Sequence, residues 1–550
     1  MRQIFEKLLY QRSFPAVLLG IVLVCSFIGL GSWGLTETCE SRYAQIAAEM
    51  LDTGDYLRPQ LMGIYHYHKP PLTYQITALG YHIFGKSEFA SRFFMQIALL
   101  IQLILVFKIA MLLFENRKKA LLAMLIYFSL PLVLVSTRNL TTDAYLNTAV
   151  LSSIYFWLSY KSNEKLWYNL LFFYLFLGII INIKGPVGLI FPALLVFSHA
   201  IIFKSKIRFN VLALSGLILF IILSGFWTFS LTQQYPDLLN YFVDEQILSR
   251  VNSNSYNRTK PIWYYALILP LVILPWLWPV VKSFFRADRS TNPNRSLNRL
   301  LIWNVVLIFI IFSAFSTKLI LYILPISLYL SFLAVQGIDK MNPKQKKYTE
   351  FIVAAIGLII PISASLAAWF SDQIEIDHLS LIAISLTVLI LYMWLFRRSQ
   401  DSIRLSVLAL TTGNVLMVSS TIFFRNNEIM VNSVKPIMTH IEQDPELSSR
   451  RILVFNYLLA SADFYSEQPV ITVNNGHNTV QRDLRFQDNE NWKNTIVNMR
   501  GRDKKVILDS LMQKPSLILV RRRSDQIESS DLFLNRKLQM IDFDKWVLFY

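Results

Sequence analysis

The sequence has little charge, almost no cysteine and no surplus of glycine or proline. Only 16% of its 550 residues are charged, whereas soluble domains usually carry about 25%. Two cysteines exclude a disulfide-rich secreted scaffold, and 18 glycines with 20 prolines exclude a collagen-like or low-complexity chain. Apolar residues make up 54% of the chain, and the mean hydropathy is +0.42. This composition indicates a polytopic membrane protein rather than a series of soluble domains.

Long apolar runs recur along residues 1–425. A helix needs about 20 mostly apolar residues to cross a bilayer. We therefore expect a polytopic α-helical membrane domain of about 13 transmembrane helices, at 14–34, 91–113, 118–137, 143–160, 166–183, 186–203, 210–231, 262–281, 299–316, 319–337, 349–370, 379–396 and 404–424.

The basic residues are distributed unevenly. Residues 426–550 hold 17 basic and 16 acidic residues, so nearly all of the net charge of +17 belongs to residues 1–425. Such a surplus is also typical of nucleic-acid-binding proteins, but here lysine and arginine gather in alternate connections between the apolar runs. The positive-inside rule then places the N-terminus in the cytoplasm and, with thirteen spans, the C-terminal region outside. We expect a lipid bilayer and no nucleic acid as partner.

Two connections on the predicted outer side are long, at 36–88 and 233–261. In the first, apolar residues recur every three or four positions over 41–56 and again over 70–85, which predicts two amphipathic helices on the membrane surface. Residues 426–550 are predicted to form a small extracytoplasmic α/β domain. Short apolar strands are expected at 451–457, 468–473 and 516–520, with helical pieces at 462–466, 490–501 and 504–513.

Ionisable residues gather at the predicted outer ends of the spans, where they are candidates for function. They are Glu37, Glu40, Arg42, Tyr43, His66, His68, Lys69, Arg138, Asp143, Lys184, Arg250, Arg258, Lys318 and Tyr322. Several cations at one membrane face suit an anionic headgroup such as a phosphate or pyrophosphate. Lys318 and Tyr322, four residues apart, are expected on one helical face, from which Tyr322 adds a hydroxyl donor. A carboxylate beside such a site could act as general base towards a hydroxyl acceptor.

The motifs resemble a known family. The segments ETCESRYAQIAAEMLDTGDYLRPQL, YHKPPLTY and FGKSEFASR are followed by RNLTTDAYL, IKGPVGL, DEQILSRVNSNSYNRTKPIWYYALILPLVILPW and FSTKLILYILP. Together they resemble the bacterial polyprenyl-phosphate-sugar glycosyltransferases of the GT-C fold, which include aminoarabinose lipid A transferases and relatives of protein O-mannosyltransferases. The resemblance covers the membrane half and says little about residues 426–550.

The resemblance implies a reaction. A sugar on polyprenyl phosphate is transferred, with inversion, to a hydroxyl of lipid A, another glycolipid, a glycan or a protein at the outer face of the bacterial inner membrane. Arg42 and Lys69 would hold the donor phosphate, assisted by Tyr322 and by Lys318 at the basic position before the Tyr-Ile-Leu-Pro run. Asp143 matches an acidic position of the family. Tyr43, His68, Arg138, Lys184, Arg250 and Arg258 are further site candidates.

The sequence departs from the family pattern at two acidic positions. Cys39 stands where the family has an aspartate, and a thiol is a poor general base. Glu37 and Glu40 are the alternatives, with Glu37 favoured for its reach. His68 replaces the acid before Lys-Pro-Pro.

The resemblance requires no cofactor. A divalent metal bound by His66, His68 and an acid stays open as an alternative. Three alternative functions also stay open: a transporter or flippase, a ligase that uses a pyrophosphate-linked donor, and an inactive homologue.

Overall fold

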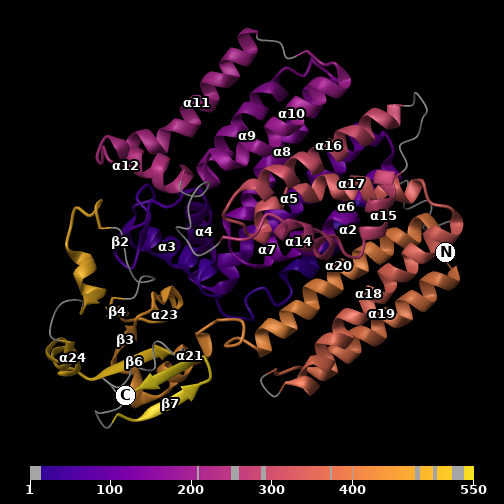
Figure 1. The fold of residues 1–550 in the computed structure, drawn as a ribbon. Coiled ribbons are helices and arrows are strands. Elements are labelled where there is room, and N and C mark those ends of the chain that lie inside the picture. Colours follow the sequence, from indigo (N-terminus) through magenta and orange to yellow (C-terminus); the bar gives the residue numbers. More distant parts are fainter. Residues whose placement is uncertain are drawn as a thin grey trace.

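The computed structural model describes residues 14–206, 210–248, 259–285, 293–371, 374–398, 401–476, 484–499, 504–522 and 538–550. Figure 1 shows a large assembly of helices with a smaller sheet-containing part at its lower left, next to the indigo segment that follows the first helix. The arrangement places the first outer connection between the helices and the sheet.

The membrane part consists of long apolar helices. Within the described residues seven helices are long and apolar enough to cross a bilayer: α5 (Glu88–Phe114), α10 (Ile190–Phe203) with its preceding turn η1 (Pro186–Leu189), α11 (Val211–Thr232), α16 (Pro293–Ala314), α18 (Pro343–Phe370), α19 (His378–Arg398) and α20 (Asp401–Asn426). The number rises to nine if each of two bent pairs is one span: α6 (Arg117–Phe128) with α7 (Pro131–Arg138), bent by 59°, and α14 (Tyr264–Ile273) with α15 (Leu277–Phe285), bent by 117°. A multi-pass helical membrane protein is therefore confirmed.

The other four predicted spans coincide with shorter or more polar helices. They are α2 (Phe14–Phe27), α8 (Thr142–Ser162), α9 (Tyr168–Lys184) and α17 (Ile326–Asp339). The run predicted at 14–34 forms a helix only to Phe27, because Gly29 adopts a left-handed backbone with φ of 63°. The total of thirteen spans stays a prediction.

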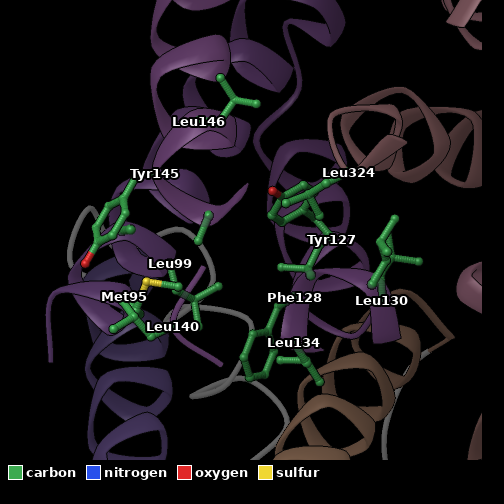
Figure 2. Close-up of a cluster of buried hydrophobic side chains, with 14 of the residues drawn as sticks. Met95, Leu99, Tyr127, Phe128, Leu130, Leu134, Leu140, Tyr145, Leu146 and Leu324 are labelled. Atoms are coloured by element: carbon green, nitrogen blue, oxygen red, sulfur yellow. The ribbon is translucent and has the colours of Figure 1, made fainter. Parts of the chain in front are cut away.

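A buried apolar core joins the early helices. Figure 2 shows Met95 and Leu99 of α5 facing Leu140, just before α8, and Tyr145, in the first turn of α8, while Tyr127 and Phe128 of α6 pack near Leu134 of α7. A polar network lies in the same region, since Tyr127 donates a hydrogen bond to Oε1 of Gln102 at 2.6 Å and Asn147 donates to the same atom at 3.0 Å. These contacts fix the beginning of α8, which carries Asp143.

The first outer connection forms the two predicted helices, with a hairpin between them that the sequence did not predict. It contains α3 (Cys39–Thr53), a hairpin of β1 (Gln60–Leu61) and β2 (Ile64–Tyr65), and α4 (Leu72–Phe84). Gly54 ends α3 in a left-handed conformation with φ of 71°, which a glycine adopts without steric cost. The second connection contains α12 (Leu238–Asn240) and a π-helical turn, η2 (Tyr241–Leu248), before residues outside the description.

The C-terminal region forms a six-stranded mixed sheet in the order β5-β4-β3-β6-β8-β7. Its parallel strands are β3 (Arg451–Phe455), β4 (Ile471–Asn474), β5 (Ile496–Asn498) and β6 (Ser516–Arg521), and β7 (Met540–Phe543) and β8 (Trp546–Phe549) are antiparallel. Among the described residues of this region, four helices accompany the sheet: α21 (Lys435–Gln443), α22 (Pro445–Ser448), α23 (Ala460–Tyr465) and α24 (Lys504–Met512).

The three predicted strands are present in this sheet, but the helix expected at 490–501 is wrong. Residues Asn491–Asn494 form a 3-10 turn, η5, and β5 follows. The β-branched pair Ile496 and Val497 favours a strand, and Ile496 is buried where β5 pairs with β4.

Candidate functional site

Arg42, Tyr43 and Lys69 meet at the beginning of α3. The Lys69 ammonium donates a hydrogen bond to the Tyr43 hydroxyl and lies 5.0 Å from the centroid of its ring. Tyr43 is buried and packs on Tyr74, with ring centroids 5.5 Å apart. Arg42 is half-buried, and in the part of the chain that the structure describes its guanidinium has no hydrogen bond or ion pair. A half-buried guanidinium in this state is a ready partner for a ligand anion.

A second group of side chains joins the ends of three helices. Asp143, in the first turn of α8, forms an ion pair with Lys184, the last residue of α9. The Lys184 ammonium also lies 4.7 Å from the centroid of the Tyr322 ring, in the 3-10 turn η3 (Ile320–Ile323). The side chains of Asp143 and Lys184 retain 12% and 6% of their exposure. The pair is therefore accessible at its edge.

These two groups form one cluster. Burial raises the pKa of the Tyr43 phenol, and the charges of Cys39 and Asp143 raise it further, while Arg42 opposes the shift. Tyr322 also raises the pKa of the Tyr43 phenol. Side chains from both groups described above therefore lie within electrostatic reach of Tyr43. We call Arg42, Tyr43, Lys69, Asp143, Lys184 and Tyr322 the cation cluster. It combines three cations with one carboxylate, and its members come from five segments of the chain.

Glu40 lies in a closed ion pair outside this cluster. Its Oε1 and Oε2 accept hydrogen bonds from Arg92 at 2.8 and 2.9 Å, and further ones come from the backbone N–H groups of Thr36 and Leu140 at 2.9 and 3.1 Å. Both charged side chains are fully buried. Burial alone raises the pKa of Glu40, but Arg92 and the N–H donors outweigh it and hold the pKa below its ordinary value. With both oxygens occupied, Glu40 has the environment of a structural anion.

Arg92 is a residue that sequence reasoning missed. Its remaining N–H groups donate to the carbonyl oxygens of Leu30, Trp33 and Gly34 at 2.9–3.0 Å. A single arginine at the start of an apolar run is a usable signal, because an unpaired guanidinium would not be buried there. The sequence shows this signal, but it cannot show that Glu40, 52 residues earlier, is the partner.

Glu37 connects the first outer connection to the C-terminal region. Its Oε1 accepts a hydrogen bond from the backbone N–H of Ser461 in α23 at 2.9 Å, and its carbonyl oxygen accepts one from Asn432 at 3.1 Å. Burial raises the pKa of Glu37, and hydrogen bonds from Ser461 and the charge of Arg42 oppose the shift. Glu37 is therefore near Arg42 but is held by α23.

Two predicted cations are bound to protein atoms. Arg138 donates to the carbonyl oxygen of Ser26 at 2.6 Å and to the Thr421 hydroxyl at 2.5 Å, and it stacks on Trp33. Lys318 donates to the carbonyl oxygen of Lys260 at 2.9 Å.

The expectation that Lys318 and Tyr322 share a helical face is wrong. Lys318 precedes η3 in an irregular segment, and Leu319, between Lys318 and η3, is extended with φ of −128° and ψ of 151°. Tyr322 instead faces Lys184, as described above.

His68 lies beside the cluster rather than in it. Its ring stacks on His66 with centroids 4.2 Å apart and meets the edge of Tyr241 at 6.2 Å. Across the described ranges, no three His, Cys, Asp or Glu side chains are grouped as a metal site. Arg250 and Arg258 lie outside the described residues.

Comparison with known proteins gives consistent matches. Residues 68–229 match the family described as dolichyl-phosphate-mannose-protein mannosyltransferase. The chain is 30% identical over 367 residues to the undecaprenyl phosphate-alpha-4-amino-4-deoxy-L-arabinose arabinosyl transferase 1 of Proteus mirabilis, which covers 64% of this chain and 65% of that protein. It is 32% identical over 334 residues to an arabinosyl transferase of the same description from Yersinia pestis, over 60% of this chain and 59% of that protein. The chain thus spans less than two thirds of the length of these relatives.

Two crystal structures share the fold over nearly the whole chain. ArnT from Cupriavidus metallidurans bound to undecaprenyl phosphate matches with a TM-score of 0.76 over 98% of both chains, at 18% identity. The apo state of the same protein matches with a TM-score of 0.75 over 97% of both chains. The chain therefore has the fold of ArnT. The resemblance to polyprenyl-phosphate-sugar glycosyltransferases of the GT-C fold, expected from the motifs, is confirmed.

Proposed function

We propose that this protein is an integral membrane glycosyltransferase that moves a sugar from a polyprenyl-phosphate donor to an acceptor hydroxyl. The observation that carries the proposal is the cation cluster, in which Lys69 donates to Tyr43, Lys184 pairs with Asp143, and the charges of Arg42 and Asp143 both act on the Tyr43 phenol. Such an excess of cations suits a phosphate next to a reacting sugar. The arabinosyl transferases to which the chain is similar act on undecaprenyl-phosphate sugars by their names, which makes that donor class the first choice.

In this proposal the donor phosphate lies between Arg42 and Lys69. Arg42 supplies two parallel N–H donors to phosphate oxygens, and Lys69 supplies a point charge that Tyr43 orients. Negative charge grows on the bridging oxygen as the sugar departs, so these cations stabilise the transition state more than the ground state. Tyr322 adds a hydroxyl donor and its ring holds Lys184.

Asp143 is the general base of the proposed reaction. It takes the proton of the acceptor hydroxyl, the acceptor oxygen forms a bond to the anomeric carbon, and the bond from that carbon to the phosphate oxygen breaks. The leaving polyprenyl phosphate keeps the electron pair, and attack from the opposite face inverts the anomeric centre. Lys184 pairs with Asp143 and so holds this carboxylate at the cluster, in the first turn of α8.

The other carboxylates are less suited to the role. Glu40 is enclosed by Arg92 and three other donors, and Glu37 is bound by α23. Cys39 stands at the family's aspartate position but is a thiol. Asp143 is thus the carboxylate that is both in the cluster and partly accessible. Its retention beside Lys184 supports an active enzyme over an inactive homologue.

The proposed setting is the bacterial inner membrane. We infer thirteen spans, a cytoplasmic N-terminus and a periplasmic C-terminal region, with the membrane domain at 1–425 and a soluble domain at 426–550. Lipid A is the first acceptor to test, before other glycolipids, glycans and proteins. The gathering of charges at one end of the helices, and the similarity to transferases, favour this function over a transporter or flippase.

The test uses purified protein in lipid nanodiscs, a panel of undecaprenyl-phosphate sugars and an acceptor extract containing lipid A. Transfer is followed by mass spectrometry of the products. Wild type is compared with Arg42→Gln, Lys69→Gln and Asp143→Asn, and with Lys86→Gln as an exposed control in the same outer connection. We expect transfer by wild type and the control and loss in the other three. Transfer at the wild-type rate by all three variants would overturn the assignment of the cluster.

A further inference from the structure

The hairpin β1–β2 precedes Lys69 in the chain and is too small to be stable alone. Each strand has two residues, and its turn uses Met62 and Gly63 in left-handed conformations with φ of 53° and 73°. Two paired residues on each strand give marginal stability, and the left-handed backbone conformation of Met62 adds a steric cost. The position of this hairpin must therefore depend on contacts from other elements.

Three contacts from the C-terminal region hold the hairpin. Both carboxylate oxygens of Asp488 accept hydrogen bonds from the Tyr65 hydroxyl, at 3.1 and 3.2 Å. The Thr495 hydroxyl donates to the carbonyl oxygen of Met62 at 2.8 Å. The backbone of Trp492 passes within 3.8 Å of where a Cβ on Gly63 would lie, so it covers the turn directly.

Asp488 also ties the hairpin to the second outer connection. The Tyr235 hydroxyl donates to Oδ2 of Asp488 at 3.1 Å, and Arg58 reaches the same oxygen at 3.3 Å. Tyr235 and Tyr65 belong to one aromatic group in which Tyr67 and Phe486 are buried. One carboxylate thus joins three segments that are far apart in the sequence.

The hairpin in turn fixes the path to Lys69. The backbone N–H of His66 donates to the carbonyl oxygen of Pro59 at 2.7 Å, which extends the hairpin pairing by one more bond. His66 then stacks on His68, directly before Lys69. A shift of the hairpin would therefore move the Lys69 ammonium relative to Tyr43 and Arg42.

We propose that Asp488 and Thr495 are positioning residues for the donor-phosphate site, acting through the β1–β2 hairpin on Lys69. The C-terminal region then takes part in donor binding through the hairpin. This inference rests on the proposed function, because it assumes that Lys69 binds a polyprenyl phosphate.

Binding of undecaprenyl phosphate, without a sugar, to the full-length protein in nanodiscs tests the proposal. The variants are Asp488→Asn, Tyr65→Phe and Thr495→Val, and Glu490→Gln is the matched control, because Glu490 is 78% exposed and pairs with Lys493. Asp488→Asn keeps the size of a side chain that is 45% exposed, and Tyr65→Phe keeps the buried ring, so both are expected to fold. We expect Kd to rise about fivefold to tenfold in the three variants and to stay unchanged in the control.

A double-mutant cycle separates positioning from general loosening. In a Lys69→Ala background, Asp488→Asn should weaken binding no further, because the residue through which it acts is gone. Equal Kd values for wild type and all three variants, or full additivity with Lys69→Ala, would overturn the positioning role while leaving the proposed function intact. A wild type that does not bind undecaprenyl phosphate would overturn the proposed function and this inference with it.

Discussion

Two carboxylate–cation pairs lie close together in the structure but differ in burial and in the number of hydrogen-bond partners. Glu40 and Arg92 are fully buried, and the hydrogen bonds that they form with each other and with backbone groups leave both Glu40 oxygens occupied. Asp143 and Lys184 keep some exposure, and Lys184 has an aromatic ring rather than carbonyl oxygens on its other side. Both acids stand in motifs of the same family resemblance. The structure therefore separates an acid that holds the fold from an acid that is available to a substrate.

The separation follows from the number of partners. A buried charge is tolerated when every lone pair and N–H group is satisfied, and removal of one partner leaves the other uncompensated. A charged group that still has free hydrogen-bonding capacity at an accessible edge can bind a ligand, and its replacement costs the fold less stability. The same substitution made in each pair should therefore have opposite consequences, which four predictions test in order of decreasing effect.

Arg92→Met should destabilise the protein by about 3–5 kcal/mol, because it leaves the Glu40 carboxylate buried without its cation. Lys184→Met is the matched variant in the other pair, and it should reduce transfer more than stability. The measurement is the thermal midpoint of the purified proteins by size-exclusion chromatography after heating. If Arg92→Met retains the wild-type midpoint, the contrast between the pairs fails.

Asp143→Asn should lower kcat by about 10²–10⁴-fold, the range expected for loss of a general base. The amide keeps the size of the side chain, so the thermal midpoint should change little. Glu40→Gln serves as the comparison and should show the reverse pattern. Its thermal midpoint should fall, while the protein that remains folded should have a specific activity near that of wild type. Normal kcat in Asp143→Asn would remove its assignment as base.

Glu49 extends the comparison to a buried carboxylate that receives N–H donors and, among the described residues, no cation. It accepts hydrogen bonds from the backbone N–H groups of Met62 and Gly63, and burial with the nearby charge of Asp463 raises its pKa to about 7. Because this pKa is above its ordinary value of 4.5, ionisation disfavours the folded state. The neutral Glu49 carboxyl therefore contributes to the free energy of unfolding in full below about pH 4.5, and this contribution is lost as the pH rises through 7.

The Glu49→Gln side chain stays neutral at every pH. The thermal midpoint of this variant relative to that of wild type should therefore rise as the pH rises from 5 to 8, by an amount equivalent to about 3 kcal/mol at most. Glu467→Gln, an exposed change, is the control and should show no such trend. A difference between Glu49→Gln and wild type that is constant with pH would contradict the raised pKa.

Tyr322→Phe gives the smallest expected effect. The substitution keeps the ring that faces Lys184 and removes only the hydroxyl, so it should raise the donor KM by a few-fold at most and leave the thermal midpoint unchanged. Tyr322→Leu should do more, because it also removes the ring. Wild-type kinetics in both variants would show that Tyr322 contributes nothing to the donor site.

Much of this architecture was predictable from local patterns. The apolar runs, the two amphipathic helices at 41–56 and 70–85, and the strands at 451–457, 468–473 and 516–520 all follow from hydrophobic periodicity. The helix expected at 490–501 failed because pairing with β4, a contact over more than 20 residues, selects a strand at Ile496–Asn498.

The site was only partly predictable for the same reason. Motif positions identified Arg42, Tyr43, Lys69, Asp143 and Lys184, which do come together. They could not show that Glu40 is enclosed by Arg92 or that Lys318 is held by a backbone carbonyl, because both outcomes depend on partners that are remote in the sequence.

The contacts of Arg138 have a consequence for biosynthesis. Its guanidinium donates to Ser26 in α2 and to Thr421 in α20, which are the first and the last helices that the structure describes in the membrane part. During synthesis Ser26 precedes Arg138, whereas Thr421 follows it by 283 residues. A nascent chain therefore carries an incompletely paired charge among apolar helices until α20 packs against α7. The packing of α20 thus completes the set of hydrogen bonds that Arg138 begins with α2.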